Sequence, residues 1–379
     1  MKLFHLSDLH LGKRVCEQSL KEDQEDILDQ IVRLAESKKP DAVMIAGDIY
    51  DRSLPSEEAV SMFDDFLYRL SLLNIRILII GGNHDSQERV AYGGRIMKRS
   101  GIFIAPEFNK NNYGRVTEPV VLNDEFGEVS FYLLPFVTPA SVRAARENTT
   151  AVSFTDAVRA VISDMNIDVS KRNILIAHQF VTGASVCESE TFSVGGTDNV
   201  DASVFDGFDY VALGHLHGAQ SVGRETVRYC GTPLKYSFSE VDHKKSVTLV
   251  NVGEKGEIGV SFLPLDKPLH DWKEISGTFD EVIKRANAND YIKVTLTDND
   301  DISDAVKKLR EFFPNMLQLS FGNARINSEY DAARLENVQS LSPTELFAEF
   351  YKKQRGTDLS EQQMKTVTEI FEEIRACIQ

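Results

Sequence analysis

Short apolar segments alternate with amphipathic stretches through roughly the first 265 residues of the chain. Six of these segments have the length of a β-strand: Lys2–Leu6, Ala42–Ala46, Ile75–Ile80, Ser130–Pro135, Asn173–Ala177 and Tyr210–Leu213. Residues 23–37 and 57–72 carry apolar side chains at helical spacing, whereas residues 226–263 alternate between strands and turns. Runs such as AVMIA and ILII are apolar at every position, which indicates strands covered on both faces. The alternation therefore predicts a layered α/β domain with mixed sheets.

The overall composition is that of a globular protein. Of 379 residues, 42% are hydrophobic and 26% are charged, which suits a substantial core and excludes disorder as the dominant state. No apolar run approaches the roughly 18 residues that a membrane span requires. Ser7, Asp8 and His10 interrupt the first apolar segment, so it lacks the core of a signal peptide. We therefore expect a soluble, cytoplasmic protein.

Cysteine spacing and charge exclude two further classes of protein. The four cysteines lie far apart without a CxxC pair, which excludes a disulfide framework and a thiolate zinc site: Cys16, Cys187, Cys230 and Cys377. The chain has 42 basic and 58 acidic residues, a net charge of −16, which argues against a general basic surface for nucleic acid. A polyanionic substrate would need positive charge from metal ions or from a partner protein.

A change in composition at Pro264–Trp272 predicts a domain boundary. We expect a first domain over residues 1–265, a second over 272–325 and a helical segment over 340–379. The second domain is predicted as a β-α-β unit: strand Tyr291–Thr297, helix Ile302–Phe313 and strand Met316–Phe321. In the last segment, Ser342 followed by Pro343 is typical of a helix start.

Five short polar motifs each follow one of the predicted strands. They are Asp8-Leu9-His10, Gly47-Asp48 with Asp51 nearby, Gly82-Asn83-His84-Asp85, Ala177-His178-Gln179 and Gly214-His215-Leu216-His217. In layered α/β folds, ligands gather at the carboxyl ends of strands, so these motifs are expected to meet at one rim. The neighbouring glycines permit the tight turns that such a rim requires.

The spacing within the motifs indicates a site for two metal ions. In an extended chain, residues two apart point the same way, so Asp8 and His10 can hold one ion, as can His215 and His217. The candidate ligands are Asp8, His10, Asp48, Asn83, His178, His215 and His217. If Asp48 bridges two ions, each ion receives four protein ligands and keeps positions for water and substrate. Mixed imidazole, carboxylate and amide donors suit manganese, iron or zinc better than magnesium or calcium.

His84 and Asp85 are predicted to act beside the metal ligands. Two metal ions held in this way are typical of sites where water attacks a phosphoryl group in line with its leaving oxygen. His84 directly follows Asn83, and we expect it to bind the phosphate of such a substrate and to protonate the leaving oxygen, with Asp85 tuning or orienting it. A single histidine, or one DxH motif, is more often an ordinary core or surface feature. The joint order of five motifs after five strands favours a site, and it does not include His5, His243 or His270.

The motifs SDLHLG, GDIYD, GGNHD and GHLH ahead of YCGTP resemble those of the calcineurin-like metallophosphoesterase superfamily, and over nearly the whole chain those of its bacterial nuclease subunits. This resemblance implies a four-layer α-β-β-α sandwich with a small α/β capping domain and a C-terminal helical tail. It also implies two Mn²⁺ ions at the seven positions, other divalent transition metals being possible. The implied activity is exonucleolytic and endonucleolytic cleavage of DNA at duplex ends and hairpins, in DNA repair, recombination and replication.

Asp51 is a departure from this resemblance. It stands where archaeal and eukaryotic relatives have a histidine, so the role of that histidine cannot simply be assigned to Asp51.

The resemblance further implies protein partners. The chain has no GxxxxGK[ST] motif, and the related nucleases work with an SbcC-like ATPase of the structural-maintenance-of-chromosomes type. The implied assembly is a nucleoid-associated heterotetramer containing a homodimer of this chain, with residues 57–72 and 87–99 at its interface. The tail carries two apolar stripes: Leu346, Phe347, Phe350 and Tyr351, then Met364, Val367, Ile370, Phe371 and Ile374. Periodicity alone fits a hairpin packed on its own chain equally well; the resemblance favours docking to the ATPase.

Several alternatives remain open at this point. A metallophosphoesterase for small phosphodiesters or phosphoproteins would share the ligands, but it would have neither a capping domain nor a docking tail. A metal-free scaffold on the same fold would typically lose ligands, and all seven are present here.

Residues 180–200 are a candidate loop over the active site. Four basic residues of the second domain are either a solvated face or DNA contacts: Lys293, Lys307, Lys308 and Arg310.

Overall fold

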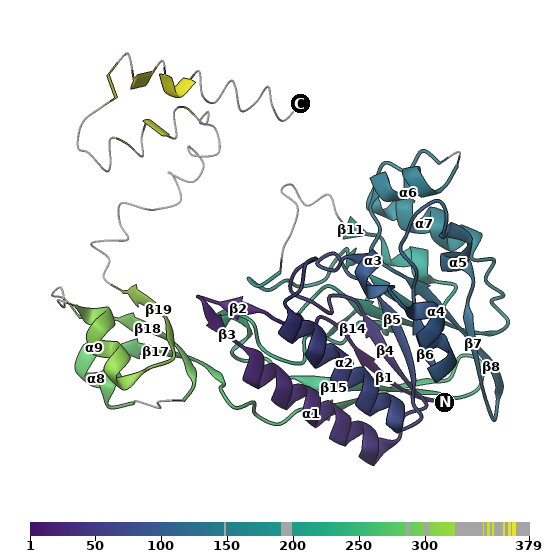
Figure 1. The fold of residues 1–379 in the computed structure, drawn as a ribbon, viewed down its shortest axis with the longest axis horizontal. Helices are drawn as coiled ribbons and strands as arrows, with labels where there is room; N and C mark the ends of the chain where they lie inside the picture. The colour runs from purple at the N-terminus through teal and green to yellow at the C-terminus, as the bar shows by residue number, and fades with distance from the viewer. Residues whose placement is uncertain are drawn as a thin grey trace. The chain divides into compact units, whose positions relative to one another are not determined.

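The computed structural model describes residues 1–147, 149–190, 199–285, 289–298, 302 and 304–322 (Figure 1). It also describes 344, 347–348, 351, 359–360, 363–364 and 366–368. By their internal contacts the residues form two compact units, the first of Met1–Ile275, Arg285–Val294 and Ala305–Leu319, the second of Ser276–Lys284, Thr295–Asp304 and Ser320–Gln379. None of the described helices is both long and apolar enough to cross a membrane.

The first sheet has six strands in the order β16-β15-β1-β4-β5-β6. Four strands run parallel: β1 (Lys2–Leu6), β4 (Ala42–Ala46), β5 (Arg76–Ile80) and β6 (Ile102–Ile104). Strand β15 (Ser246–Val252) pairs antiparallel with β1 and with β16 (Ile258–Pro264). The sheet is therefore mixed, as the sequence predicted.

The second sheet also has six strands, in the order β13-β14-β12-β9-β8-β7. Its four central strands are parallel: β8 (Gly127–Leu134), β9 (Arg172–His178), β12 (Tyr210–Gly214) and β14 (Arg224–Tyr229). Both edge strands, β7 (Val120–Asp124) and β13 (Gln220–Val222), are antiparallel to their neighbours. Two short ribbons lie outside the large sheets: β2 (Arg14–Val15) with β3 (Gln18–Ser19), and β10 (Phe180–Val181) with β11 (Asn199–Val200).

The two large sheets share a buried core. Leu3, Met44 and Leu78 of the first sheet form one apolar cluster with Phe131 and Ile176 of the second, and all five are almost fully buried. Burial of each such side chain contributes about 1.5–3 kcal/mol, which explains why these strands are apolar on both faces.

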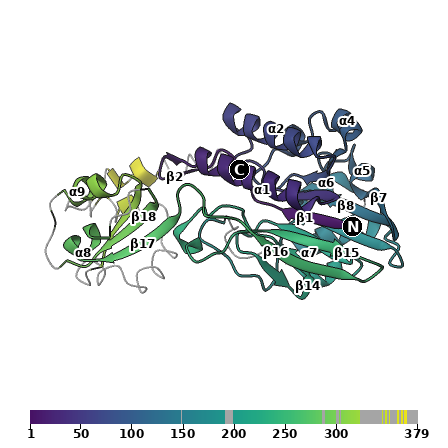
Figure 2. The ribbon, with the colours of Figure 1, turned by 90° about the horizontal axis from the view of Figure 1, so that it is seen from below.

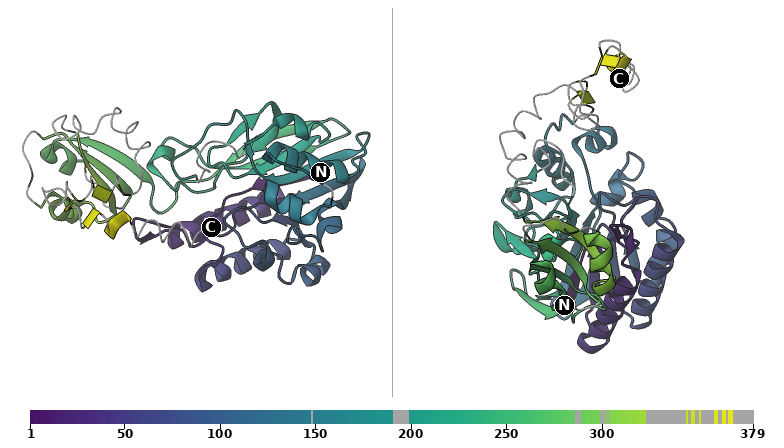
Figure 3. Two further views of the ribbon diagram at one scale, coloured as in Figure 1. Left: turned by 90° about the horizontal axis from the view of Figure 1, so that it is seen from above. Right: turned by 90° about the vertical axis from the view of Figure 1, so that its left-hand side faces the viewer.

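Helices cover the other face of each sheet. The first sheet packs against α1 (Lys21–Lys38) and α2 (Glu57–Leu72), which lie on the same side of β1 (Figure 2). The second sheet packs against α5 (Tyr113–Thr117), α6 (Pro139–Ala145) and α7 (Phe154–Asp164). Figure 3 shows these elements from two further sides. The prediction of an α/β fold with mixed sheets is thus confirmed.

Residues 87–99, which the resemblance places at a dimer interface, do not form one continuous helix. They consist of α3 (Gln87–Val90), α4 (Gly94–Met97) and a 3₁₀ turn over Lys98–Ser100. Gly93 adopts a φ of 74° between the two helices, a left-handed conformation that ends a helix. Apolar periodicity alone could not locate this break.

The C-terminal part of the chain contains a three-stranded sheet in the order β17-β18-β19. Strand β18 (Tyr291–Leu296), helix α9 (Ala305–Phe312) and strand β19 (Met316–Phe321) correspond to the predicted β-α-β unit. Strand β17 (Trp272–Gly277) and helix α8 (Phe279–Ile283) were not predicted. Of the tail residues singled out above, Leu346, Phe350, Ile370, Phe371 and Ile374 lie outside the described residues.

Candidate metal centre

The seven predicted ligands come together at the carboxyl ends of five strands. Asp8 and His10 follow β1, Asp48 follows β4 and Asn83 follows β5. His178 ends β9, and His215 and His217 follow β12. Three groups of side chains each have their ligand atoms within 4.8 Å of one another: Asp8, His10 and His217; His10, Asp48 and His84; and Asp48, His178 and His215. Together they include every predicted ligand except the amide of Asn83, and they add His84.

Unusual backbone conformations direct these side chains into the site. Asp8, His10 and Asp48 have φ values of 53°, 43° and 48°, a left-handed region that costs a non-glycine residue on the order of 1–3 kcal/mol. Hydrogen bonds between the two loops compensate for this cost: the Asp8 N–H donates to Gly47 O and the His10 N–H to Asp48 O, both at 3.0 Å. The loops after β1 and β4 therefore act as one rigid frame.

Two glycines in the motifs permit close approach around the ligands. A Cβ atom on Gly82 would lie 2.1 Å from Asp48 Oδ1, and one on Gly214 would lie 1.9 Å from Ala46 O. Both distances are far below van der Waals contact, so any larger residue would displace a ligand loop. The glycines of GGNHD and GHLH are therefore required by the geometry of the site.

One half of the predicted site consists of Asn83, His178, His215 and Asp48. The Asn83 Oδ1 atom lies 2.9 Å from His178 Nε2 and 2.9 Å from His215 Nδ1. His178 Nε2 is also 3.3 Å from Asp48 Oδ2, and its Nδ1 is 2.8 Å from Ala46 O. Because a carbonyl oxygen only accepts, His178 Nδ1 carries a proton and Nε2 is the atom that can bind a metal.

The other half of the predicted site consists of Asp8, His10, His217 and, again, Asp48. His10 Nε2 is 3.2 Å from His217 Nε2 and 3.8 Å from Asp48 Oδ2. The Asp8 carboxylate accepts the His215 N–H at 3.0 and 3.1 Å and the hydroxyl of Ser7. Asp48 thus contacts members of both groups, which is the position that a bridging ligand would occupy.

The donor set fits divalent transition metals. His10 and His217 point the same type of nitrogen at each other in a buried site, where at most one of them can donate a proton to the other. Imidazole nitrogens, two buried carboxylates and one amide oxygen match manganese, iron or zinc. One or two such cations would accept the lone pairs of ligand atoms that otherwise face one another in the site, such as His10 Nε2 and His217 Nε2.

Burial controls the protonation of most of the ligands. It raises the pKa of Asp8 to about 8, with a further contribution from Asp48, and lowers the pKa of His215 to about 3. Burial also lowers the pKa of His10 and His217, so these imidazoles are neutral and able to bind a metal. His178 differs: burial lowers its pKa, but the charge and hydrogen bond of Asp48, the charge of Asp8 and the hydrogen bond to Ala46 O together outweigh burial and raise the pKa to about 9.

His84 lies beside the ligands and is held through its Nδ1 atom. Its backbone N–H donates to Asp48 Oδ1 at 2.9 Å, and its ring centroid is 4.9 Å from that of His10. His84 Nδ1 lies 3.0 Å from Asp51 O, an acceptor, so Nδ1 carries the proton and Nε2 is available to a substrate. This placement is compatible with the predicted catalytic role.

Asp85 holds the ligand loops through their backbones. Its Oδ2 accepts the N–H groups of Gly82 at 2.9 Å and Ile49 at 3.1 Å, and its Oδ1 accepts that of Tyr50 at 3.0 Å. These bonds join the loop after β5 to the loop after β4. Any effect on His84 is therefore transmitted through the loop, and direct tuning of the ring stays a prediction.

Asp51 forms an ion pair at the edge of the site. Its Oδ1 is 2.7 Å from Lys13 Nζ and 3.8 Å from His10 Nδ1, a buried atom that has no hydrogen-bond partner among the described residues. Lys13 also lies 5.5 Å from the ring of Tyr236. Asp51 is therefore placed to hold Lys13 near the His10 ring.

Several polar residues that support the site were not found from the sequence. Gln24 Nε2 donates to His10 O at 2.8 Å, and Tyr236 donates its hydroxyl to Leu9 O. Ser189 Oγ lies 2.7 Å from His217 Nδ1, and Glu190 accepts the His217 N–H. No spacing rule singles these residues out, although Ser189 and Glu190 fall within the predicted loop over 180–200, of which 191–198 lie outside the described residues.

The residues outside the motif pattern have other partners. His5 is buried, with Nδ1 3.0 Å from the Tyr210 hydroxyl and Nε2 3.2 Å from Leu213 O. His270 Nδ1 lies 3.1 Å from Asp23 Oδ2. Lys293 pairs with Glu274 at 2.7 Å, and the basic residues of α9 are exposed: Lys307, Lys308 and Arg310.

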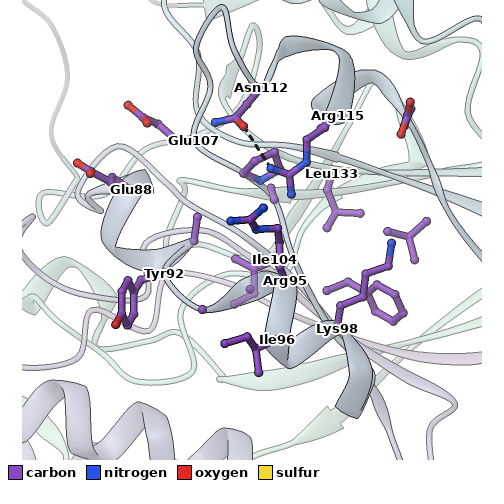
Figure 4. A pocket seen from close by; sticks show the side chains of 18 of the residues that line it. Glu88, Tyr92, Arg95, Ile96, Lys98, Ile104, Glu107, Asn112, Arg115 and Leu133 are labelled. Carbon is purple, nitrogen blue, oxygen red and sulfur yellow. Dashed lines mark hydrogen bonds between the residues drawn. The ribbon is translucent and has the colours of Figure 1, made fainter.

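A separate cavity contains none of the predicted site residues (Figure 4). Tyr92, Arg95, Ile96 and Lys98 line it from the region of α4, and Arg115, which donates to Asn112 at 3.2 Å, lines it from α5. The cavity therefore belongs to the region predicted for the dimer interface and not to the metal ligands.

Comparison with known proteins agrees with this geometry. Residues 1–219 match the calcineurin-like phosphoesterase family, and residues 267–355 match a family described as the type 5 capsule protein repressor C-terminal domain, the C-terminal domain of SbcD. Over 388 aligned positions the chain is 32% identical to SbcD, a subunit of the nuclease SbcCD, from Staphylococcus epidermidis, with 98% of each sequence covered.

Two solved structures are also similar. A crystal structure of TT1561 from Thermus thermophilus aligns with 69% of this chain and 98% of its own, at 11% identity and a TM-score of 0.38. A dimetal phosphatase from Danio rerio aligns with 70% of this chain and 98% of its own, at 11% identity and a TM-score of 0.41. Similarity at this level adds nothing about substrate or partners.

Proposed function

This chain belongs to the calcineurin-like phosphoesterase family, and on that premise we propose that it is the manganese-dependent nuclease subunit of an SbcCD-type complex. The proposed reaction is exonucleolytic and endonucleolytic cleavage of DNA phosphodiester bonds at duplex ends and hairpins. The observation that carries the proposal is the convergence of seven ligand residues from five strands on Asp48, in a chain related over its whole length to a nuclease subunit.

The proposed mechanism assigns different tasks to the ligands and to His84. Asp8, His10, Asp48 and His217 would hold one cation, and Asp48, Asn83, His178 and His215 the other. When bound, a pair of cations neutralises phosphate charge and supplies an activated water for in-line attack. For the transfer, His84 would carry a proton on both nitrogens: Nδ1–H would stay on the Asp51 carbonyl, while Nε2–H would contact the phosphate and pass its proton to the leaving sugar oxygen. Asp85 and the Asp51 carbonyl would keep the loop and the ring of His84 in place.

The proposal accounts for the acidic character of the chain. With a net charge of −16, the protein has little long-range attraction for DNA. Cations in the site and an ATPase partner would supply the missing positive charge. The isolated, metal-free chain is therefore expected to bind duplex DNA weakly, and tight binding in EDTA would contradict this part of the proposal.

We further propose three finer features of the assembly. The 1–265 region would form a four-layer nuclease domain, the 272–325 region would act as a capping domain that positions DNA, and the 340–379 segment would dock as helices on an SbcC-like ATPase. Two copies would associate through 57–72 and 87–99, in a cytoplasmic, nucleoid-associated complex. Exposed apolar side chains in these two regions support the dimer: Tyr68 and Leu72 on α2, Ile96 on α4, and Tyr92 in the turn before α4.

One assay separates the proposal from its alternatives. The purified chain with Mn²⁺ is tested on hairpin DNA and on a generic aryl phosphodiester. Cleavage of both, with DNA cut at the hairpin, is the expected result. Cleavage of the aryl ester alone would favour a small-molecule or phosphoprotein esterase. Failure to cleave either substrate or to bind Mn²⁺ would favour a metal-free scaffold.

A further inference from the structure

Glu240 is a fully buried carboxylate close to the metal ligand His217. It ends a 3₁₀ turn over Phe238–Glu240, and its side chain has no exposed area. Glu240 Oε2 pairs with Lys245 Nζ at 2.6 Å, so the carboxylate is charged and is balanced by a cation whose side chain is only 10% exposed. Glu240 Oε1 lies 3.6 Å from His217 Nδ1, too far for a direct hydrogen bond.

Ser189 bridges this gap. Its Oγ lies 2.7 Å from Glu240 Oε1 and 2.7 Å from His217 Nδ1. A serine hydroxyl has one proton, and an ionised carboxylate can only accept, so Ser189 donates to Glu240. The second contact of Ser189 must then be one in which it accepts, which places a proton on His217 Nδ1.

This chain of hydrogen bonds determines which nitrogen of His217 is free. With the proton on Nδ1, the lone pair belongs to Nε2, the atom that lies 3.2 Å from His10 Nε2. Lys245 strengthens the arrangement, because its Nζ also donates to His217 O at 3.2 Å and to Thr232 Oγ1 at 2.6 Å. The ring and the backbone of His217 are thus held by the same buried ion pair.

We propose that Glu240, acting through Ser189, is a positioning residue that fixes the tautomer and ring orientation of His217 so that Nε2 faces the bound cation. The cation itself rests on the proposed function. Hydrogen bonds that orient metal-binding imidazoles in this way typically change metal affinity by about 10–100-fold. A carboxylate and lysine buried only for stability would have no such effect on affinity.

The test compares three variants. Ser189→Ala removes only the bridging hydroxyl. Glu240→Leu combined with Lys245→Met removes the ion pair without leaving a buried charge unpaired. Ser237→Ala is the matched control, because Ser237 Oγ also bonds Glu240 Oε1, at 3.1 Å, and has no described contact with His217.

Two measurements are made on each protein. In metal-free, ¹⁵N-histidine-labelled protein, the ¹⁵N shifts of His217 report which ring nitrogen is protonated. Wild type and Ser237→Ala are expected to show a protonated Nδ1, and the other two variants a mixture containing protonated Nε2. Calorimetric titration with Mn²⁺ is expected to show affinity at one of two sites falling about tenfold or more in those variants, and less than about twofold in the control.

The outcomes distinguish this inference from the proposed function. If wild type binds no Mn²⁺, the proposed function is wrong, and the ¹⁵N shifts still decide the tautomer. If wild type binds Mn²⁺ but folded Ser189→Ala keeps the wild-type tautomer and affinity, the positioning role is overturned. Should the double variant fail to fold, Ser189→Ala decides alone.

Discussion

His10 Nε2 and His217 Nε2 lie 3.2 Å apart in a buried site, although the two residues are separated by 207 positions in the chain. At most one of these nitrogens can carry a proton shared between them, and burial lowers the pKa of both rings. A divalent cation would be bound by both lone pairs at once. The contact between His10 and His217, and the similar clustering of ligand atoms around Asp48, are the basis of the metal-binding predictions below.

Replacing Asp48 should remove both cations together. The Asp48→Asn variant retains the shape of the side chain but loses the charge that contacts both ligand groups, so we expect Mn²⁺ stoichiometry to fall from two to below one. Nuclease activity should fall by at least about 10³-fold, since catalysis depends on both ions. Calorimetry and a hairpin cleavage assay measure these quantities. Asp64→Asn, an exposed change on α2, is the control; a variant that still binds two ions would show that Asp48 is not the bridge.

His84→Gln should separate metal binding from turnover. The His84 ring lies near His10 and Asp48, but it is not among the seven proposed ligands, so Mn²⁺ affinity should change less than about threefold. Loss of a general acid typically lowers turnover by about 10²–10⁴-fold. Mn²⁺ titration and single-turnover DNA cleavage test the two effects separately. Unchanged turnover would exclude His84 as the proton donor.

The stabilisation that metal gives the fold should increase as pH rises. Burial raises the pKa of Asp8 to about 8, and the combined interactions of His178 with Asp48, Asp8 and Ala46 raise its pKa to about 9 despite burial. Without metal, the folded protein holds more protons than the unfolded chain from about pH 6.5 to 8, so its stability falls as pH rises through this range. Mn²⁺ displaces these protons and binds more tightly as pH rises. The gap between melting temperatures in Mn²⁺ and in EDTA should therefore widen from about pH 6.5 to 8, and a constant gap would contradict the assignment.

Deleting residues 340–379 should abolish assembly without affecting catalysis. The deletion removes the proposed ATPase-docking helices and none of the seven ligands. The shortened chain is expected to elute separately from an SbcC-like ATPase in size-exclusion chromatography, while the full chain co-elutes. Its Mn²⁺-dependent activity on hairpin DNA should stay within about twofold of the full chain. Continued co-elution would place the docking surface elsewhere.

Charges on the exposed face of α2 should disrupt the proposed dimer. Tyr68 and Leu72 are one helical turn apart and expose 61% and 62% of their surface, so Tyr68→Glu with Leu72→Glu should leave the monomer fold intact. Burial of the new charges would strongly oppose association. Sedimentation velocity should show the variant as a monomer where wild type is a dimer. The control, Asp65→Asn, changes another exposed residue of α2 and should leave the dimer unchanged.

Local sequence determined many of the elements of this protein and the residues proposed as its ligands. The strands Lys2–Leu6 and Ala42–Ala46 and the helix Glu57–Leu72 were predicted with the bounds that the structure shows. The strands are short, mainly apolar runs bounded by polar residues, and the helix carries apolar residues at helical spacing throughout. The seven ligand residues could be named because each follows a strand and several follow glycine. Parallel strands bring such positions to one edge of a sheet whatever the remaining sequence is.

Only the tertiary structure decided how the ligands are supported. Ser189 and Glu240 reach His217 from 28 and 23 residues away in sequence, and Gln24 reaches His10 from α1. Asp85 binds backbone amides, and the break at Gly93 divides a helix that periodicity alone would continue. Such contacts depend on how buried loops pack against one another. A polar residue that will be buried and bonded in the fold has the same local pattern as one that stays in solvent.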